Sequence, residues 1–200
     1  MTQATLDQSQ AGVQHETAGP THLLKAGAVI VDDWHEWVPS PQSSEENGKQ
    51  HAASDHFPPD EPHWIVPLSF WLKNEATLRA RQHSVGIRVD PADDPFDLVS
   101  TAPDTLDPTG IALIAVAFPN FNDGRGYSHA YTLRAHLGWH GELRAVGDVL
   151  IDTMFYLARC GFDSYAVKPG HDPHAALDAL NTFSQRYQRG YTEVATAPRR

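Results

Sequence analysis

The chain has 200 residues, a formal net charge of −10 at neutral pH and a single cysteine. This length suits one domain with a sizeable hydrophobic core. The excess of acidic side chains argues against nonspecific binding to nucleic acid or to anionic membranes, and leaves open a basic partner or a local basic pocket.

The N-terminal part of the chain has little periodicity. We expect a disordered arm at 1–21, followed by a single domain at 22–190. Within the domain, residues 23–38 indicate a short strand or hairpin. A loop insertion rich in Pro, Ser, Glu and His is expected at 39–62, and a frayed tail at 191–200.

From Ile65 onward, strand and helix patterns alternate. Short strands are predicted at 65–68, 85–89, 111–118, 142–146 and 164–168. Helices are predicted at about 69–81, 94–101, 128–137 and 149–160, with a last one that begins at Asp172-Pro173. Nearly every position of 111–118 is apolar, which is typical of a strand buried in a parallel sheet.

This alternation predicts an α/β fold of repeated βα units. The sheet should be mostly parallel, with about five strands besides the N-terminal strand or hairpin. It could be open and doubly wound, or it could be part of a (βα)8-type barrel, because periodicity does not separate the two. In both architectures ligands bind at the carboxyl ends of the strands.

The segment FPNFNDGRGYS at 118–128 is the most informative strand end, because a Gly-rich charged turn follows the most apolar run. Gly124 and Gly126 would let backbone amides approach an anion or a cofactor phosphate, and Ser128 stands where the predicted helix begins. The sequence does not identify a cofactor, since GRGYSH lacks the third glycine of a dinucleotide fingerprint and no P-loop run occurs.

Three further side chains of this segment suit proton or anion chemistry. Arg125 could clamp an oxyanion through two parallel hydrogen bonds, and Asp123 and Tyr127 could handle a proton. The alternative is a tight turn at Asp123-Gly124 with Ser128 as the helix cap.

A second candidate site lies in GELRAVGDVLID at 141–152. In a strand here, Glu142 and Arg144 point to the same face, and charges within a central strand are costly unless they are paired or face a cavity. Asp148 follows at the strand end. It could contribute to a site there, or it could cap the next helix.

The single cysteine limits the chemistry of the chain. Cys160, in RCGFD at 159–163, lies near a helix end that does not favour a thiolate, so we expect a small buried apolar side chain. One cysteine also excludes a disulfide framework and a four-cysteine iron–sulfur cluster within the chain. The 12 histidines lack metal-ligand spacing, and we expect no metal site.

No apolar run approaches the roughly 18–20 residues that a membrane span requires. The first 20 residues also lack the apolar core of a signal peptide. We therefore expect a cytoplasmic protein that contacts neither membrane nor nucleic acid.

The segments 118–128, 141–150 and 159–163 together resemble a bacterial family of unknown function whose members are encoded beside sulfite/nitrite reductase genes. Some members are labelled as oxidoreductases of sulfite reduction. The resemblance covers about residues 22–188 and implies a cytoplasmic role in assimilatory sulfite reduction. Because one cysteine cannot ligate the cluster of a sirohaem reductase, the chain itself is not the catalytic haemoprotein.

Three functions are compatible with these observations. The first is an accessory protein of sulfite reduction that binds the sulfite/nitrite reductase haemoprotein or a small anion. Its anion-friendly pocket would be built from Asp123, Arg125, Tyr127, Arg144 and Asp148. The second is an independent lyase- or isomerase-like enzyme with an aspartate as base and an arginine as electrostatic stabiliser. The third is an interaction module in which these charges form one internal network. The oligomeric state is not predicted.

Overall fold

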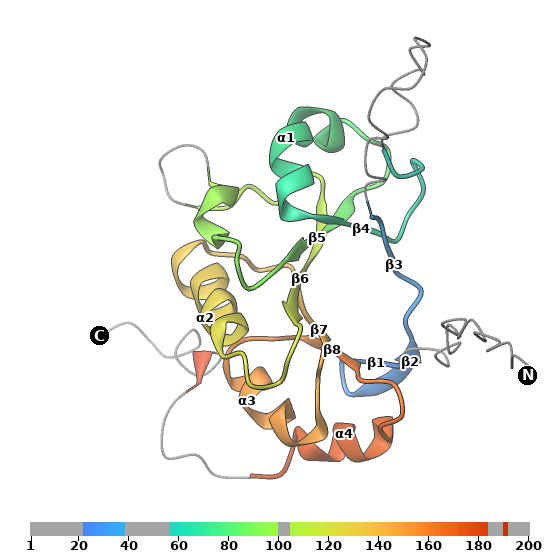
Figure 1. Cartoon of the computed structure of the whole chain (residues 1–200), viewed down its shortest axis with the longest axis vertical. Coiled ribbons are helices and arrows are strands. Elements are labelled where there is room, and N and C mark those ends of the chain that lie inside the picture. Colours follow the sequence, from blue (N-terminus) through green and yellow to red (C-terminus); the bar gives the residue numbers. More distant parts are fainter. Residues whose placement is uncertain (1–21, 39–56, 100–104, 184–189, 192–200) are drawn as a thin grey trace, which may run out of the picture.

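An eight-stranded sheet forms the centre of the protein in the computed structural model (Figure 1). The structure describes residues 22–38, 57–99, 105–183 and 190–191. The predicted N-terminal arm, most of the predicted insertion and all but the first residue of the predicted tail lie outside the described residues.

The strands and helices alternate along the chain as predicted from Ile65 onward. The strands are β1 (His22–Lys25), β2 (Ala28–Val31), β3 (His35–Glu36), β4 (Trp64–Pro67), β5 (Val85–Val89), β6 (Ile111–Phe118), β7 (Glu142–Gly147) and β8 (Ser164–Val167). The α-helices are α1 (Leu68–Arg79), α2 (Arg125–Tyr131), α3 (Met154–Arg159) and α4 (Pro173–Ala179). Short 3₁₀ turns lie at Pro95–Leu98 and Ile151–Thr153, and a π-helical turn at Thr132–His136 continues α2.

The strand order is β2-β1-β8-β7-β6-β5-β4-β3, with every pair from β3 to β8 parallel. The α/β class is therefore confirmed, but the predicted count of about five strands is too low. β1 pairs with β2 and with β8 in antiparallel register, so the N-terminal hairpin extends the same sheet. The two-residue β3 is too short to leave a periodic signal in the sequence.

The strand order distinguishes between the two predicted architectures, the open doubly wound sheet and the part of a (βα)8-type barrel. Right-handed crossovers between strands that always step in one direction place every helix on the same face. A doubly wound sheet needs a reversal of this order, and none occurs from β3 to β8. The sheet is instead curled into a half-barrel with its helices outside (Figure 1).

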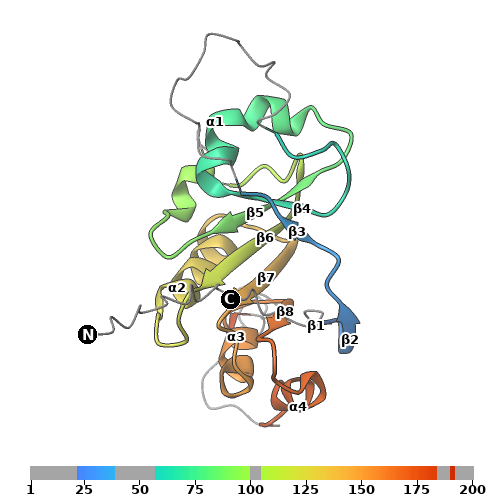
Figure 2. The same ribbon diagram turned by 45° about the vertical axis from the view of Figure 1, so that its right-hand side comes forward.

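The segment Asp32–Trp34 reveals how strongly the sheet curls. It joins β2 at one edge to β3 at the other, and the four steps from Val31 to His35 span about 14 Å at most. The edges of a flat eight-stranded sheet would lie about 34 Å apart. The edges must therefore approach one another, and Asp32–Trp34 crosses the open side of the half-barrel (Figure 2).

Two separate cores follow from this curvature. The outer core packs the outward side chains of the strands against the helices, with Trp71 of α1, Leu133 beyond α2 and Met154 of α3 fully buried. The inner core contains aliphatic side chains of the strands, three of them alanines, and the partly buried Trp34. Its buried members are Leu23, Ile65, Leu113, Ala115, Ala117, Val146 and Ala166.

The start of α2 differs from the prediction. The helix begins at Arg125 rather than Ser128, with Gly124 at the N-cap position and no side-chain cap. Just before it, the carboxylate of Asp123 accepts a hydrogen bond from the Arg125 amide at 3.1 Å, which forms a turn that leads into the helix. Ser128 is an exposed residue inside α2 and caps nothing. The predicted cap at Asp172 is confirmed, since its side chain accepts from the amide of His174.

Candidate functional site

The carboxyl ends of β6, β7 and β8 are tied together by Asp148. Its Oδ2 accepts a hydrogen bond of 2.9 Å from the amide of Phe121, in the loop after β6. Its Oδ1 lies 2.6 Å from Nζ of Lys168, the first residue after β8. The hydrogen bonds from Lys168 and then from Phe121 lower the pKa of Asp148 below its usual value. Asp148 is thus a bridge between loops and not a helix cap.

Arg125 and Asp123 pair with each other in the loop that leads into α2. The guanidinium lies 2.6 Å from Oδ2 of Asp123, and the Arg125 side chain is 61% exposed. The side-chain and backbone hydrogen bonds from Arg125 lower the pKa of Asp123 to about 2. The side-chain hydrogen bond from Asp123 raises the pKa of Arg125 in turn. Arg125 is the exposed partner of this pair, whereas the Asp123 side chain is 20% exposed.

The two glycines of the same segment have different structural roles. A Cβ on Gly126 would lie 2.6 Å from the ring of Phe118, so this glycine is needed for α2 to pack on the end of β6. A Cβ on Gly124 would meet no atom within 4 Å, and its backbone has an ordinary helical φ of −76°. Close packing explains Gly126, whereas Gly124 leaves its backbone open to solvent.

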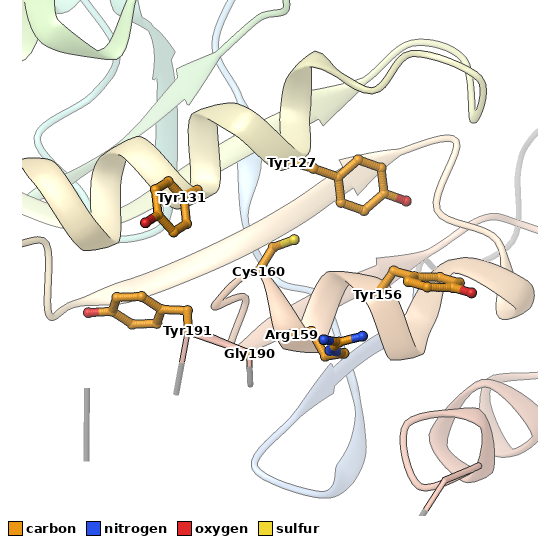
Figure 3. A pocket seen from close by; sticks show the side chains of 7 residues that line it. All are labelled: Tyr127, Tyr131, Tyr156, Arg159, Cys160, Gly190 and Tyr191. Atoms are coloured by element: carbon orange, nitrogen blue, oxygen red, sulfur yellow. The ribbon is translucent and has the colours of Figure 1, made fainter. Parts of the chain in front are cut away.

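Tyr127 lies between α2 and α3, where its ring packs against Phe118 at the end of β6 (Figure 3). Burial raises the pKa of its phenol, although a hydrogen bond with Thr153 opposes the shift. The cavity there has a volume of about 540 Å³, and we call it the tyrosine pocket. Its lining residues are Tyr127, Tyr131, Tyr156, Arg159, Cys160, Gly190 and Tyr191.

Arg144 lies inside the half-barrel, where it pairs with Glu142, predicted on the same strand face, and with Asp32, which the sequence analysis had not connected to it. Its side chain is 1% exposed, and its guanidinium lies 2.8 Å from Oδ1 of Asp32 and 2.7 Å from Oε1 of Glu142. The same guanidinium stands over the ring of Trp34, 5.4 Å from the centroid. The predicted charge in a central strand is therefore satisfied by partners on the same strand and on the crossing segment.

Glu142 completes this buried network. It accepts hydrogen bonds of 2.6 Å from Nζ of Lys25 and from Oγ of Ser164, besides those from Arg144. Burial opposes the ionised carboxylate, but the hydrogen bonds from Lys25, Ser164 and Arg144 outweigh it and lower the pKa of Glu142. The network joins β1, β7 and β8 to Asp32, so it holds the curled sheet to the segment that crosses its open side.

The five residues predicted to form one pocket thus lie in four separate places. Arg125 pairs with Asp123, and Tyr127 lines the tyrosine pocket. Arg144 pairs within the half-barrel, and Asp148 pairs with Lys168. The register also separates them, because Arg144 lies opposite Ala115 in the middle of β6, whereas the Arg125 pair follows the end of that strand. Two of the five side chains contact the linings of the pockets described next: Asp148 through Lys168, and Arg144 through Asp32 and Trp34.

A mouth pocket of about 320 Å³ opens at the carboxyl end of the half-barrel. Trp34 forms its floor with small and apolar strand residues, and the carboxylates of Asp32 and Glu36 are the charged groups of its lining. The complete lining consists of Asp32, Trp34, Glu36, Ile65, Val146, Gly147, Ala166, Val167 and Pro169. This composition favours an apolar or cationic occupant over an anion.

A basic pocket of about 410 Å³ lies on the other side of Val167 and Pro169. It brings together Lys168, His171 of the loop before α4, and His22, which the antiparallel register places opposite Val167. Its remaining polar side chain, Asp172, already accepts a hydrogen bond from an amide of α4. The two histidines and the lysine thus bring three nitrogen-bearing side chains together in a protein of net charge −10, although Lys168 is also paired with Asp148.

The sequence analysis missed Lys168, His22 and His171. Lys168 was assigned to the last strand, whereas β8 ends at Val167 and leaves Lys168 in the loop. The run Lys-Pro-Gly-His directly after a buried strand is the signal that could have indicated this site. His22 had no such signal, because its place beside the end of β8 depends on the antiparallel pairing of β1.

Among the described residues, no group of three or more His, Cys, Asp or Glu side chains could hold a metal ion. In the same part of the chain, no helix is long and apolar enough to cross a membrane.

Comparison with known proteins adds a family to this geometry. No curated protein and no solved structure matches the chain. The family model described as a bacterial protein of unknown function (DUF934) matches residues 86–197, which is more than half of the chain. The match includes the segments at 118–128, 141–150 and 159–163, and with them β6, β7, β8 and the helices between. The protein therefore belongs to this family of bacterial proteins of unknown function.

Proposed function

We propose that the protein is an accessory component of assimilatory sulfite reduction, and that it binds a small oxyanion such as sulfite in the basic pocket. Lys168 supplies a permanent positive charge, and His22 and His171 supply imidazole donors. The proposal includes a cytoplasmic location beside the reductase haemoprotein, which would receive or share the anion.

The observation that carries this proposal is the convergence of Lys168, His22 and His171 on one pocket of an acidic protein. A protein of net charge −10 repels anions over most of its surface, so a site that attracts one must concentrate its cations locally. The basic pocket does so at the carboxyl end of β8, which is where βα architectures bind ligands. Asp148 orients Lys168 from outside the pocket lining without joining it.

The resemblance found in the sequence supports the link to sulfite reduction. The single cysteine agrees with an accessory role, because the reductase cluster needs four thiolates. The family itself adds no activity, since it is a family of unknown function.

An independent lyase or isomerase has weaker support. A general base works best with a pKa near the operating pH. The pKa of Asp123 is about 2, and the pKa of Asp148 is lowered by Lys168 and Phe121. Both carboxylates would be weak bases near neutral pH.

An interaction module is favoured by one observation. Arg144 is enclosed by an internal ion network, as expected if these charges hold the fold together. The interaction-module hypothesis concerns the Arg144 network inside the half-barrel. It is compatible with an anion site in the basic pocket at the edge of the sheet.

Calorimetric titration of the purified full-length chain with sulfite and sulfate tests the proposal. We expect saturable binding that Lys168→Gln and His171→Gln each weaken by about tenfold or more, because a hydrogen bond to a charged partner contributes about 1.5–3 kcal/mol. Lys73→Gln and His140→Gln are the matched controls, since both residues are exposed and line neither pocket at the sheet edge.

Two results would contradict the proposal. One is the absence of saturable heat with either anion at low ionic strength. The other is equal weakening by the pocket variants and the control variants, which would indicate general charge screening and no defined site.

A further inference from the structure

The tyrosine pocket is a second cavity that the proposed function does not use. It lies between α2 and α3, on the helical side of the sheet, whereas the basic pocket lies at the strand ends. Its volume of about 540 Å³ is within the roughly 300–1,000 Å³ that small-molecule sites occupy. This size makes it a candidate site for a ligand of its own.

Helical spacing builds the two walls of this pocket. Tyr127 and Tyr131 are four residues apart on α2 and lie on one face of that helix. Tyr156 and Cys160 are four residues apart at α3 and face them, while Tyr191 closes a third side (Figure 3). Four phenol rings therefore surround one space from three segments of the chain.

Two of these rings expose apolar surface that the described part of the protein does not cover. The Tyr131 residue is 53% exposed and the Tyr156 residue is 58% exposed. The ring of Tyr127 is held more firmly, because it packs edge-on against Phe118 at a centroid distance of 5.2 Å. The pocket thus has one anchored ring and two open rings on opposite walls.

The polar groups of the pocket are mostly neutral at physiological pH. Burial raises the pKa of the Cys160 thiol, which keeps it protonated, and burial also raises the pKa of the Tyr127 phenol. Arg159 stands over the ring of Phe155 at 5.7 Å. Neutral aromatic walls with hydroxyl groups at their edges suit a flat ring system that carries hydrogen-bonding groups on its perimeter.

The helix beneath the pocket has an unusual geometry. Directly after Tyr131, the chain forms the π-helical turn Thr132–His136, in which the amide of Leu137 donates to the carbonyl of Thr132 at 3.0 Å. Such turns are rare and are frequently found at functional sites. This turn adds an observation that is independent of the cavity.

We propose that the tyrosine pocket binds a planar fused heteroaromatic ring system that stacks against the exposed tyrosine rings of its two walls, Tyr131 on α2 and Tyr156 on α3 (Figure 3). Electron-rich phenol rings on both walls favour an electron-poor ring stacked against them. Riboflavin and biopterin represent this class with three and two fused rings.

Fluorescence titration of the full chain with riboflavin, and separately with biopterin, tests the inference. We expect at least one of them to bind with saturable quenching, because stacked tyrosine rings quench such fluorophores. The double variant Tyr131→Leu/Tyr156→Leu should weaken this binding at least tenfold, which corresponds to about 1.4 kcal/mol. Both tyrosines are exposed, so we expect the variant to remain folded.

Phe96→Leu is the matched control, because Phe96 is an exposed aromatic residue that does not line the pocket. It should leave the affinity unchanged. Cys160 provides a second readout, since it is the only cysteine in the chain and bound ligand should slow its alkylation by iodoacetamide.

The inference is overturned if neither probe binds saturably. It is also overturned if the double variant binds as tightly as the wild type. Neither result bears on sulfite binding, because the basic pocket has a different lining.

Discussion

Replacing Arg144 with methionine should destabilise the fold severely. Arg144 is the centre of the network that joins β7 to the segment crossing the half-barrel. Methionine keeps much of the apolar stem but removes the guanidinium. The variant therefore tests whether the network is structural, as its burial indicates.

The magnitude follows from what the substitution leaves behind. Breaking a buried ion pair by removing one partner costs about 3–5 kcal/mol. Glu142 would keep its bonds with Lys25 and Ser164, so the stranded group is Asp32, whose side chain is 12% exposed. Because Asp32 is partly exposed, the cost of breaking its ion pair should lie near the lower limit of this range of about 3–5 kcal/mol. The lost contact between the guanidinium and the Trp34 ring contributes about 1 kcal/mol more. We expect a total loss of about 3–4 kcal/mol.

Urea denaturation with a constant m-value measures this loss. Arg88→Met is the matched control, because Arg88 and Arg144 lie in register on either side of Ala115. The Arg88 side chain is 32% exposed and pairs with Glu36, so its removal should cost at most about 1 kcal/mol.

A double-mutant cycle identifies the cause. If the stranded carboxylate dominates, Asp32→Asn should recover at least about 1 kcal/mol in the Arg144→Met background. Equal losses for the two arginine variants, or strict additivity with Asp32→Asn, would refute the reasoning.

Three further predictions concern the loop after β6 and the network. Gly126→Ala should cost about 1–3 kcal/mol through overpacking, whereas Gly124→Ala should change the free energy of unfolding by less than about 0.5 kcal/mol; equal effects in chemical denaturation would contradict the packing account. Arg125→Ala removes the ion pair with Asp123, in which the arginine is exposed, and should lower the free energy of unfolding by less than about 1 kcal/mol. A larger loss in urea denaturation would mean that the pair contributes more to stability than an exposed ion pair does. Because the folded pKa of Glu142 is lowered, its contribution is present above the unfolded pKa of about 4.3 and is lost as the pH falls through the folded value. Stability curves between about pH 5 and pH 3 should be flatter for Glu142→Gln than for wild type, and parallel curves would argue against this linkage.

The sequence was sufficient to predict the βα alternation, the buried β6 and the cap at Asp172, because these depend on local periodicity and capping chemistry. The prediction that Glu142 and Arg144 share one face of β7 is confirmed by their common network. Local patterns also explain the error at α2. Ser128 is a favoured cap residue, whereas the actual N-cap, Gly124, has no side chain that could mark the helix start in the sequence.

The curvature of the sheet could not be predicted, because it depends on strand order. That order became evident only from the pairing of β1 with β8 and from the three-residue segment that crosses the half-barrel. The same long-range pairing places His22 beside Lys168 and brings Asp32 to Arg144. These two long-range links are products of tertiary structure, and residue spacing carries no signal for either of them.

Complementation of a deletion strain tests the central claim most directly. In a bacterium that carries this gene, we predict that the deletion strain grows on cysteine but poorly on sulfate or sulfite. Wild-type protein and the His140→Gln control should restore growth, and Lys168→Gln, expressed at an equal level, should not. Unimpaired growth of the deletion strain on sulfate, or full rescue by Lys168→Gln, would contradict the account.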